Sequence, residues 1–239
     1  CEERIKLGTM PQKPIAIKTI VTTQIATAIA KNYNVELIDV LTGFKFIGEQ
    51  IGFLEEKGEE NRYIFGFEES YGYLAGSYVR DKDAVVASML ICEMAAYYRT
   101  CGISLIEARA RMYKKYGVYK HQLKSFTCEG ITGMERMKEI MSSLRTQTPE
   151  SLGGLKLIAF SDYMASETVD KVTGAKTKIE LPKSDVLVFT LENNASVIIR
   201  PSGTEPKIKV YYTTTGETHE VATASYEKID EEFRKVLGF

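Results

Sequence analysis

The sequence predicts a protein of two domains, an α/β domain followed by an α+β domain. Strand-like and helix-like runs alternate over residues 15–67, which is typical of a three-layer βαβ domain with a parallel or mixed sheet. Between residues 155 and 215, strand-like runs follow one another directly, which favours a mainly antiparallel sheet. At 239 residues and 44% apolar composition, the chain can bury two cores. We place the domains at 1–118 and 119–239.

Three apolar runs of the first domain are predicted as strands with helices between them. Periodicity places one helix after a cap at Thr22 or Thr23, and a second over Gly43–Lys57 with Gly58 as its stop signal. The strands are Ile15–Thr19, Val35–Val40 and Tyr63–Phe67. This order predicts right-handed βαβ crossovers and therefore a parallel layer.

Two further helices are predicted before the boundary. Asp81 is the expected N-cap of the first. That helix is apolar almost all round, so we expect it to be buried on more than one side. Ser104 and Glu107 form a capping-box pattern for the second helix, which ends near Gly117.

The second domain is predicted to begin with a strand at Tyr119–Thr127 and a helix opened by a capping box of Thr132 and Glu135. Methionine dominates the apolar stripe of this helix, which is typical of core filling; the stripe is Met134, Met137, Ile140, Met141 and Leu144. The expected strands are Leu155–Phe160, Lys176–Leu181, Asp185–Leu191, Ala195–Ile199 and Ile208–Tyr212. A final helix over Thr218–Leu237 is expected to bury Ala222, Tyr226, Ile229, Phe233 and Val236.

Composition argues against several classes of protein. The 31 basic and 32 acidic residues nearly cancel, which disfavours a nucleic-acid or anionic-membrane surface. Two histidines make a zinc site or a His-dependent triad improbable, and four cysteines without paired spacing favour reduced thiols and a cytoplasmic location. We find no apolar run of about 18 residues and no signal peptide, so no membrane span is expected. The start at Cys1 suggests a piece of a longer protein.

The segment Arg200-Pro-Ser-Gly-Thr-Glu-Pro206, between two strand-like runs, is predicted to hold an anion. The binding groups would be the Arg200 guanidinium, the Ser202 and Thr204 hydroxyls and the amides around Gly203. Lys207 and Lys209 share one face of the return strand and could add charge. A hairpin turn without a ligand uses the same residue types and is an equal alternative.

A second loop, Gly66-Phe-Glu-Glu-Ser-Tyr-Gly72, follows the third predicted strand. Ligands of open α/β sheets bind at such carboxyl ends, and Glu68 with Ser70 could accept from neighbouring sugar hydroxyls. Polar filler is the alternative, and for Glu69 it is the favoured one. A glycoside hydrolase using Glu68 and Glu69 is conceivable, but adjacent carboxylates rarely span a glycosidic bond.

These loops resemble those of the α-D-phosphohexomutase superfamily, of the phosphoglucomutase/phosphomannomutase type. Residues 66–72 resemble its sugar-specificity loop, and residues 200–204 resemble its phosphate-binding loop. Thr42–Gly48 resembles a third-domain loop near the active site, and Arg80–Asp83 resembles the segment that places a lysine beside the phosphosugar. The resemblance covers essentially the whole chain, which is thus similar to domains three and four, the C-terminal half.

The resemblance implies the role of each candidate residue. Phosphate binding falls to Arg200, Ser202, Gly203, Thr204 and Lys209. Sugar binding falls to Glu68, Ser70, Gly43 and Lys45. Lys82 is the candidate catalytic residue, as a proton donor or charge stabiliser.

The resemblance also implies an activity for a longer parent protein. Such an isomerase, an intramolecular phosphotransferase, interconverts glucose 1-phosphate and glucose 6-phosphate through glucose 1,6-bisphosphate with Mg²⁺. The phosphoserine loop and the three-aspartate metal loop are not in this sequence, so the expected partners are the missing N-terminal domains and a phosphorylated hexose or pentose, and the chain alone is expected to be inactive. The alternatives are phosphomannomutase or phosphopentomutase specificity, and a free-standing phosphosugar-binding or regulatory module.

Overall fold

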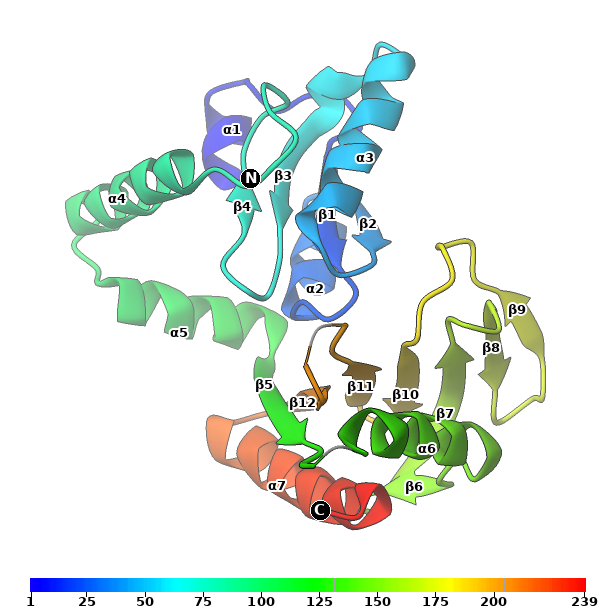
Figure 1. Ribbon diagram of the computed structural model, residues 1–239. Coiled ribbons are helices and arrows are strands. Elements are labelled where there is room, and N and C mark those ends of the chain that lie inside the picture. Colours follow the sequence, from blue (N-terminus) through cyan, green and yellow to red (C-terminus); the bar gives the residue numbers. More distant parts are fainter. Residues whose placement is uncertain (131, 204) are drawn as a thin grey trace. The chain divides into compact units, whose positions relative to one another are not determined.

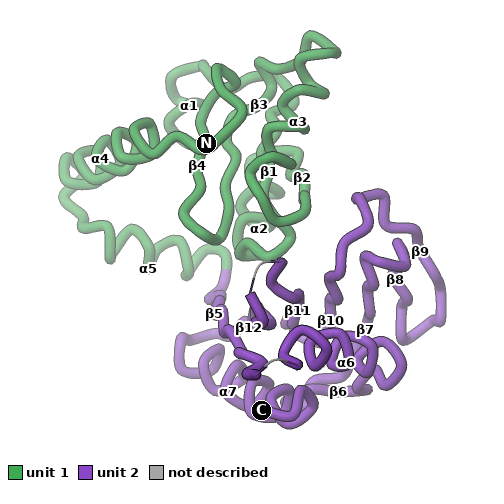
Figure 2. The backbone as a smooth tube through the Cα atoms, in the orientation of Figure 1, with its two compact units in different colours: residues 1–116 green, residues 117–239 purple. Residues whose placement is uncertain are grey.

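The computed structural model describes residues 1–130, 132–203 and 205–239. The chain divides into two compact units, Cys1–Tyr116 and Gly117–Phe239, shown in Figure 2. This division falls two residues before the boundary that we placed from the sequence. Each unit has its own sheet and its own hydrophobic core.

The sheet of the first unit has the strand order β2-β1-β3-β4 (Figure 1). The central strand β1 (Ile15–Thr19) pairs in parallel with β2 (Glu36–Val40) and with β3 (Tyr63–Phe67). The short β4 (Tyr73–Leu74) pairs antiparallel with β3. The sheet is mixed and mainly parallel, as predicted, and the residues that follow β2 and β3 leave it at the same edge.

Two helices connect these strands, after a short α1 (Glu2–Lys6). The helix α2 (Ile25–Asn32) follows β1, and α3 (Phe44–Glu56) follows β2, with the 3-10 turn η1 (Glu60–Arg62) before β3. Because α3 is amphipathic, it packs one face on the sheet; the buried core there is Ile15, Ile17, Val40, Phe44, Ile47, Ile51, Leu54, Tyr63 and Leu74.

The predicted cap of α2 was wrong. Gln24 occupies the N-cap position, and no side chain caps the helix. The Thr22 hydroxyl is instead bonded to the Thr19 hydroxyl at 2.7 Å, inside the turn that leaves β1. A hydroxyl used in the preceding turn is not available to the helix N-terminus.

The predicted burial of the next helix was also wrong. The helices α4 (Ala84–Thr100) and α5 (Leu105–Tyr116) have no buried residue. The α4 cap is Asp83, not Asp81, because the Asp83 carboxylate accepts from the amides of Val85 and Val86 at 2.8 and 3.0 Å. An apolar composition indicates that a helix needs a covering surface, but it does not say where that surface lies.

The start of α5 agrees with its predicted cap. Ser104 Oγ accepts from the backbone N–H of Glu107 at 3.1 Å, which is the first half of a capping box. The helix ends at Tyr116, where Gly117 takes a positive φ of 88°.

The second unit has an antiparallel sheet, as predicted, with the path β5-β12-β11-β10-β7-β8-β9 and β6 paired to β7. The strands are β5 (Val118–Thr127), β6 (Ser151–Leu152), β7 (Leu155–Asp162), β8 (Glu167–Asp170), β9 (Lys176–Lys178), β10 (Leu187–Leu191), β11 (Ser196–Pro201) and β12 (Lys207–Gly216). β6 and β8 were not predicted, and β9 is shorter than the expected strand. The exposed β9 forms the end of this path, and its lysines pair with acids, Lys176 with Glu167 at 2.9 Å and Lys178 with Glu180 at 3.0 Å.

The helices α6 (Gly133–Thr146) and α7 (His219–Leu237) share one core with this sheet. The strands contribute alternate residues to it, Val197 and Ile199 from β11 and Val210 and Tyr212 from β12. Because side chains alternate along a strand, the intervening residues of β11 and β12 lie on the other face of the sheet.

Two residues predicted for the helix stripes are exposed, Met134 at 47% and Val236 at 44%. In both helices the neighbouring residue is buried in their place, Gly133 in α6 and Leu237 in α7. A step of one residue turns a helix by about 100°, so an error of one position moves a side chain off the buried stripe.

The caps of the two helices differ. Thr132 lies at the N-cap position of α6 but makes no side-chain cap bond, so the predicted capping box is not formed. The Thr218 side chain caps α7 by accepting from Val221 N–H at 3.3 Å, and the left-handed Gly238 ends that helix. Within the described residues, no helix combines the length and the apolar character needed to cross a bilayer.

Replacing Phe233 by alanine should lower the free energy of unfolding of the second unit by about 3–5 kcal/mol, because the side chain is fully buried between Phe189 and Tyr212. Urea denaturation followed by circular dichroism measures this loss. Val236→Ala on the same helix is the matched control, and it should change the free energy by less than about 0.5 kcal/mol because Val236 is exposed. Equal losses would contradict the assignment of the buried stripe.

Candidate functional site

The first candidate site lies at the edge of the sheet where β2 and β3 end. Gly43 is the N-cap of α3, and its backbone N–H donates to Glu68 Oε1 at 2.9 Å. The φ of Gly43 is +118°, a conformation that L side chains rarely adopt, so glycine is required there. The carboxylate of Glu68 thus lies at the N-terminal end of α3, where the helix dipole attracts negative charge.

The loop after Glu68 folds back on itself. The Glu68 N–H donates to the Gly72 carbonyl at 2.9 Å, and Tyr71 takes a positive φ of 64° to make the turn. Gly72 is buried, and a Cβ there would lie 3.0 Å from Glu68 Oε2 and 3.1 Å from the Phe44 ring. The second carboxylate oxygen of Glu68 therefore lies over Gly72 and is directed away from Gly43.

Lys82 joins the same cluster. Its Cδ lies 3.4 Å from the position that a Cβ of Gly72 would take, and its Nζ lies 5.8 Å from the centroid of the Phe44 ring. The Nζ donates to Asp81 Oδ1 at 3.0 Å, and this bond lowers the pKa of Asp81. The side chain of Lys82 is half exposed.

The helix α3 also positions the segment that carries Lys82. Gly48 faces the backbone carbonyl of Arg80, and a Cβ on Gly48 would overlap that oxygen. Arg80 is held further along α3 by an ion pair with Glu55, and its Nη1 donates to the Ser77 carbonyl at 2.6 Å. The Asp83 N–H donates to Tyr73 O at 2.8 Å, so the segment is fixed at both ends of Lys82.

A charged residue that the sequence analysis did not single out also lies at this edge. Lys18 is fully buried near the end of β1, where it pairs in register with Asp39 of β2 and Phe67 of β3. Its ammonium forms an ion pair with Asp39 at 2.6 Å and donates to Thr22 O at 3.4 Å. A lysine inside the apolar run of residues 15–19 was the available signal, because buried ammonium groups are costly and are retained for a reason.

The other two sugar-binding candidates are less enclosed. Ser70 is exposed in the same loop as Glu68. Lys45 is exposed in the first turn of α3, with its Nζ 4.8 Å from the centroid of the Phe46 ring. The structure thus brings Gly43, Glu68 and Lys82 together, with Ser70 at the rim.

The second candidate site is the loop that joins β11 to β12. The Ser202 N–H donates to Lys207 O at 2.7 Å, and the Lys207 N–H donates to Glu205 O at 2.7 Å. The base of the loop is tied to the end of β5, since the Cys128 N–H donates to Pro206 O at 2.8 Å. Gly203 is exposed at the tip, and the predicted contribution of Thr204 lies outside the described residues.

Arg200 and Lys209 are paired directly across β11 and β12. They lie on the face of the sheet opposite the core formed with α6 and α7, because their strand neighbours Ile199 and Val210 are in that core. Arg200 Nε is buried without a hydrogen-bond partner among the described residues. Two adjacent cations repel each other and an unpaired buried donor is costly, so an anion bound here would relieve both.

Lys207 differs from these two cations. Its ammonium is already paired with Glu205 at 3.2 Å. Of the two lysines that could add charge to the loop, Lys207 therefore already has an acidic partner.

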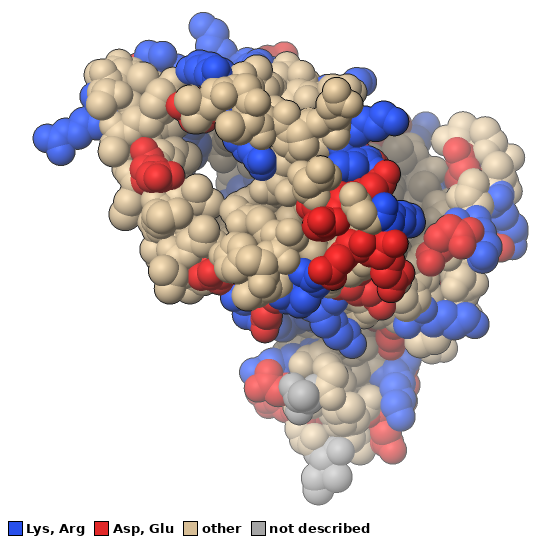
Figure 3. All heavy atoms as spheres, turned by 90° about the horizontal axis from the view of Figure 1, so that it is seen from above, with Lys and Arg blue, Asp and Glu red and all other residues tan. Residues whose placement is uncertain are grey.

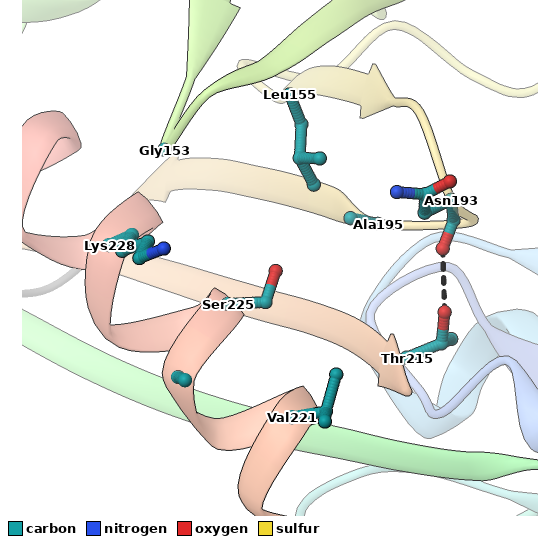
Figure 4. A pocket seen from close by; sticks show the side chains of 9 residues that line it. Gly153, Leu155, Asn193, Ala195, Thr215, Val221, Ser225 and Lys228 are labelled. Atoms are coloured by element: carbon teal, nitrogen blue, oxygen red, sulfur yellow. Dashed lines mark hydrogen bonds between the residues drawn. The ribbon is translucent and has the colours of Figure 1, made fainter. Parts of the chain in front are cut away.

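A hollow of about 360 Å³ in the second unit does not coincide with either candidate site (Figure 4). It lies between α7 and the turn that joins β10 to β11, where Thr215 Oγ1 donates to Asn193 O at 2.6 Å. That turn is at the end of β11 opposite to the anion loop. None of the predicted site residues lines the hollow. Its walls are mostly apolar, with Ser225 and Lys228 at the rim, and therefore indicate no specific chemistry.

The described part of the chain offers no metal site. No group of three or more His, Cys, Asp or Glu side chains is gathered among these residues closely enough to hold an ion. The residues present therefore do not fit the Mg²⁺ that the resemblance implies for a parent protein.

Comparison with family models gives two matches. Residues 2–116 match "Phosphoglucomutase/phosphomannomutase, alpha/beta/alpha domain III", and residues 161–230 match "Phosphoglucomutase/phosphomannomutase, C-terminal domain". Among curated proteins, the chain is similar to the phosphoglucomutase of Staphylococcus saprophyticus, with 37% identity over 211 residues, and to that of Staphylococcus aureus strain bovine RF122, with 38% over 208. These matches cover 88% and 87% of the chain but only 38% and 37% of the relatives' own length.

Solved structures with the same fold agree. Parafusin, a phosphoglucomutase from Paramecium, matches in its open form with a TM-score of 0.64 and 20% identity over 93% of the chain and 37% of its own. A putative phosphomannomutase from Thermus thermophilus matches with a TM-score of 0.60 and 18% identity over 100% of the chain and 39% of its own. At these identities the likeness concerns the fold alone.

Replacing Gly48 by alanine should lower the free energy of unfolding of the first unit by about 1–3 kcal/mol, because the new methyl group displaces the Arg80 backbone. Gly52→Ala, one turn further along α3, is the matched control. Nothing lies within 4 Å of a Cβ there, so the higher helix propensity of alanine should stabilise the unit by about 0.5–1 kcal/mol. Thermal unfolding of both variants measures the difference, and effects of the same sign would contradict the close approach.

Proposed function

Because the chain belongs to the phosphoglucomutase/phosphomannomutase family, we propose that it is the substrate-binding part of a phosphohexose mutase and binds glucose phosphates. The chain carries domain III and the C-terminal domain of that family. Named relatives at 37–38% identity are phosphoglucomutases, which supports glucose rather than mannose or a pentose as the sugar. The cytoplasmic location stays a prediction.

The phosphate end of the ligand would bind to the loop between β11 and β12. The observation that carries this proposal is the unpaired Arg200 Nε, buried beside a second cation, Lys209. A guanidinium binds phosphate through two parallel hydrogen bonds, and the hydroxyl of Ser202 would donate a third. The backbone bonds that fix the loop at Ser202 and Lys207 prepare this geometry before a ligand arrives.

The sugar end would bind in front of β3. One oxygen of Glu68 is held by Gly43 N–H, so the carboxylate keeps a fixed direction while its other oxygen accepts from sugar hydroxyls. The half-exposed Lys82 would donate to a sugar oxygen or stabilise negative charge next to it. Ser70 at the rim would complete the contacts with the hydroxyls.

The chemistry of phosphoryl transfer is assigned to the rest of the parent protein. In the proposed parent, a phosphoserine donates the phosphoryl group and glucose 1,6-bisphosphate turns round between the two half-reactions; bound Mg²⁺ would supply neutralisation of the developing charge. The role that we propose for this chain is to bind and orient the phosphosugar.

Arg200→Ala should weaken binding of glucose 6-phosphate by about 10- to 150-fold, because charge-assisted hydrogen bonds contribute about 1.5–3 kcal/mol. Titration calorimetry at low salt measures the affinity. Glu68→Gln is the cross-control. It should weaken the binding of glucose 6-phosphate by about 10-fold and leave the binding of inorganic phosphate unchanged, whereas Arg200→Ala should weaken the binding of both. Unchanged affinity of the Arg200 variant for glucose 6-phosphate would contradict the assignment of the anion site. Mannose 6-phosphate and ribose 5-phosphate in the same assay test the sugar preference.

The chain alone should not interconvert glucose 1-phosphate and glucose 6-phosphate, even with Mg²⁺ and glucose 1,6-bisphosphate present. The physical reason is that a nucleophile and a metal site are both needed for the transfer. A coupled assay for glucose 6-phosphate formation, with an intact phosphoglucomutase as positive control, measures the turnover. Measurable conversion by the chain alone would contradict the proposal that phosphoryl transfer is carried out by the rest of the parent protein.

A further inference from the structure

The helix α4 presents an apolar surface that unit 1 does not cover. Thirteen of its 17 residues are apolar, yet none of the 17 is buried. The large apolar side chains that it exposes are Val85 at 80%, Met89 at 53%, Ile91 at 50%, Met94 at 42% and Tyr97 at 39%. Glu93 and Arg99 are its charged residues, so the surface is also nearly free of charge.

These side chains are spread round the helix rather than lying on one stripe. At 100° per residue, Val85, Ile91 and Met94 point in three different directions. A helix of this kind is typical of a position between two covering layers. In Figure 1, α4 stands to one side of the strands of its unit, and Figure 3 shows that charged side chains cover only part of the face in view, with wide areas of other residues between them.

The beginning of the chain lies against the same helix. Lys6 of α1 donates to Tyr97 Oη at 2.8 Å, and its Nζ lies 5.2 Å from the centroid of that ring. The neighbouring Ile5 and Leu7 are 50% and 66% exposed. Together with the exposed side chains of α4, they form what we call the α1–α4 surface, defined as Ile5, Leu7, Val85, Met89, Ile91, Met94 and Tyr97.

Exposed apolar surfaces of this extent mark protein contacts. The polypeptide that precedes residue 1 in a longer protein would arrive beside α4, because α1 is bonded there. The relatives are long enough to supply it, since the chain accounts for only 37–38% of their length and begins with the third domain of the family. A neutral apolar surface suits a folded domain and not a charged ligand.

We propose that the α1–α4 surface is the docking surface for the part of the same polypeptide that precedes residue 1. Docking would bury α4 on the sides that unit 1 leaves open, and would fix the first unit relative to the preceding domain. This inference is independent of phosphosugar binding, because none of the residues of the α1–α4 surface belongs to either candidate site.

Hydrogen–deuterium exchange of residues 84–100 tests the proposal. We expect amides of α4 to exchange at least about 10-fold more slowly in the complete polypeptide, defined by the reading frame upstream of Cys1, than in the 239-residue chain. Equal and fast exchange in both would overturn the proposal. So would slow exchange in the monomeric 239-residue chain, which would mean that the chain covers α4 itself. Protection that rises with concentration, together with a dimer in sedimentation, would assign the surface to a second copy and also overturn it.

A pair of variants separates docking from folding. Met89→Glu should leave the unfolding midpoint of the 239-residue chain unchanged, since Met89 is exposed there, and should restore fast exchange of α4 in the complete polypeptide. Ile106→Glu on α5 is the matched control, because Ile106 is 74% exposed but lies outside the α1–α4 surface. Equal effects of the two variants, or no effect of Met89→Glu in the complete polypeptide, would contradict the assignment.

Discussion

The hydrogen bond from Gly43 N–H to Glu68 Oε1 is the constraint on which the first site depends. It joins the start of α3 to the loop after β3, and the two bonded residues are 25 positions apart in the sequence. Because one oxygen of the carboxylate is held at the helix end, the other is presented in a fixed direction over Gly72. The same helix holds the Arg80 backbone through Gly48, so Glu68 and Lys82 are positioned by one rigid element. Rigid support of this kind reduces the ordering cost of binding.

The second candidate site is organised by charge on the sheet face that lies opposite the core formed with α6 and α7. Helices cover the face that carries Val197 and Ile199, while Arg200 and Lys209 lie on the other face, side by side. A loop fixed by backbone bonds at both ends carries this charge without needing burial of the whole arginine. Within the part of the chain that the structure describes, Arg200 Nε has no hydrogen-bond partner, and the anion that we propose would supply one.

Sequence reasoning predicted those elements that local rules decide. The bounds of β1 and β3 are as predicted, because both lie in runs rich in β-branched or aromatic residues, and the loop with Glu68 follows from the position of β3. The cap at Asp83 was missed because Asp81 and Asp83 are both possible caps by residue type, and only the path of the loop selects one. Lys18 was missed because its partner Asp39 is far along the chain, and the exposure of α4 was missed because periodicity reports a need for contact, not the contact itself.

The strand β9, at the end of the sheet of the second unit, affects how the protein behaves at high concentration. An unpaired sheet edge presents free amides and carbonyls to any neighbouring molecule, and it can therefore template fibre growth. β9 carries two exposed lysines, which pair with Glu167 of β8 and with Glu180. A second sheet that approached it would have to strip water from these ions and bring like charges together, so β9 discourages polymerisation through this edge.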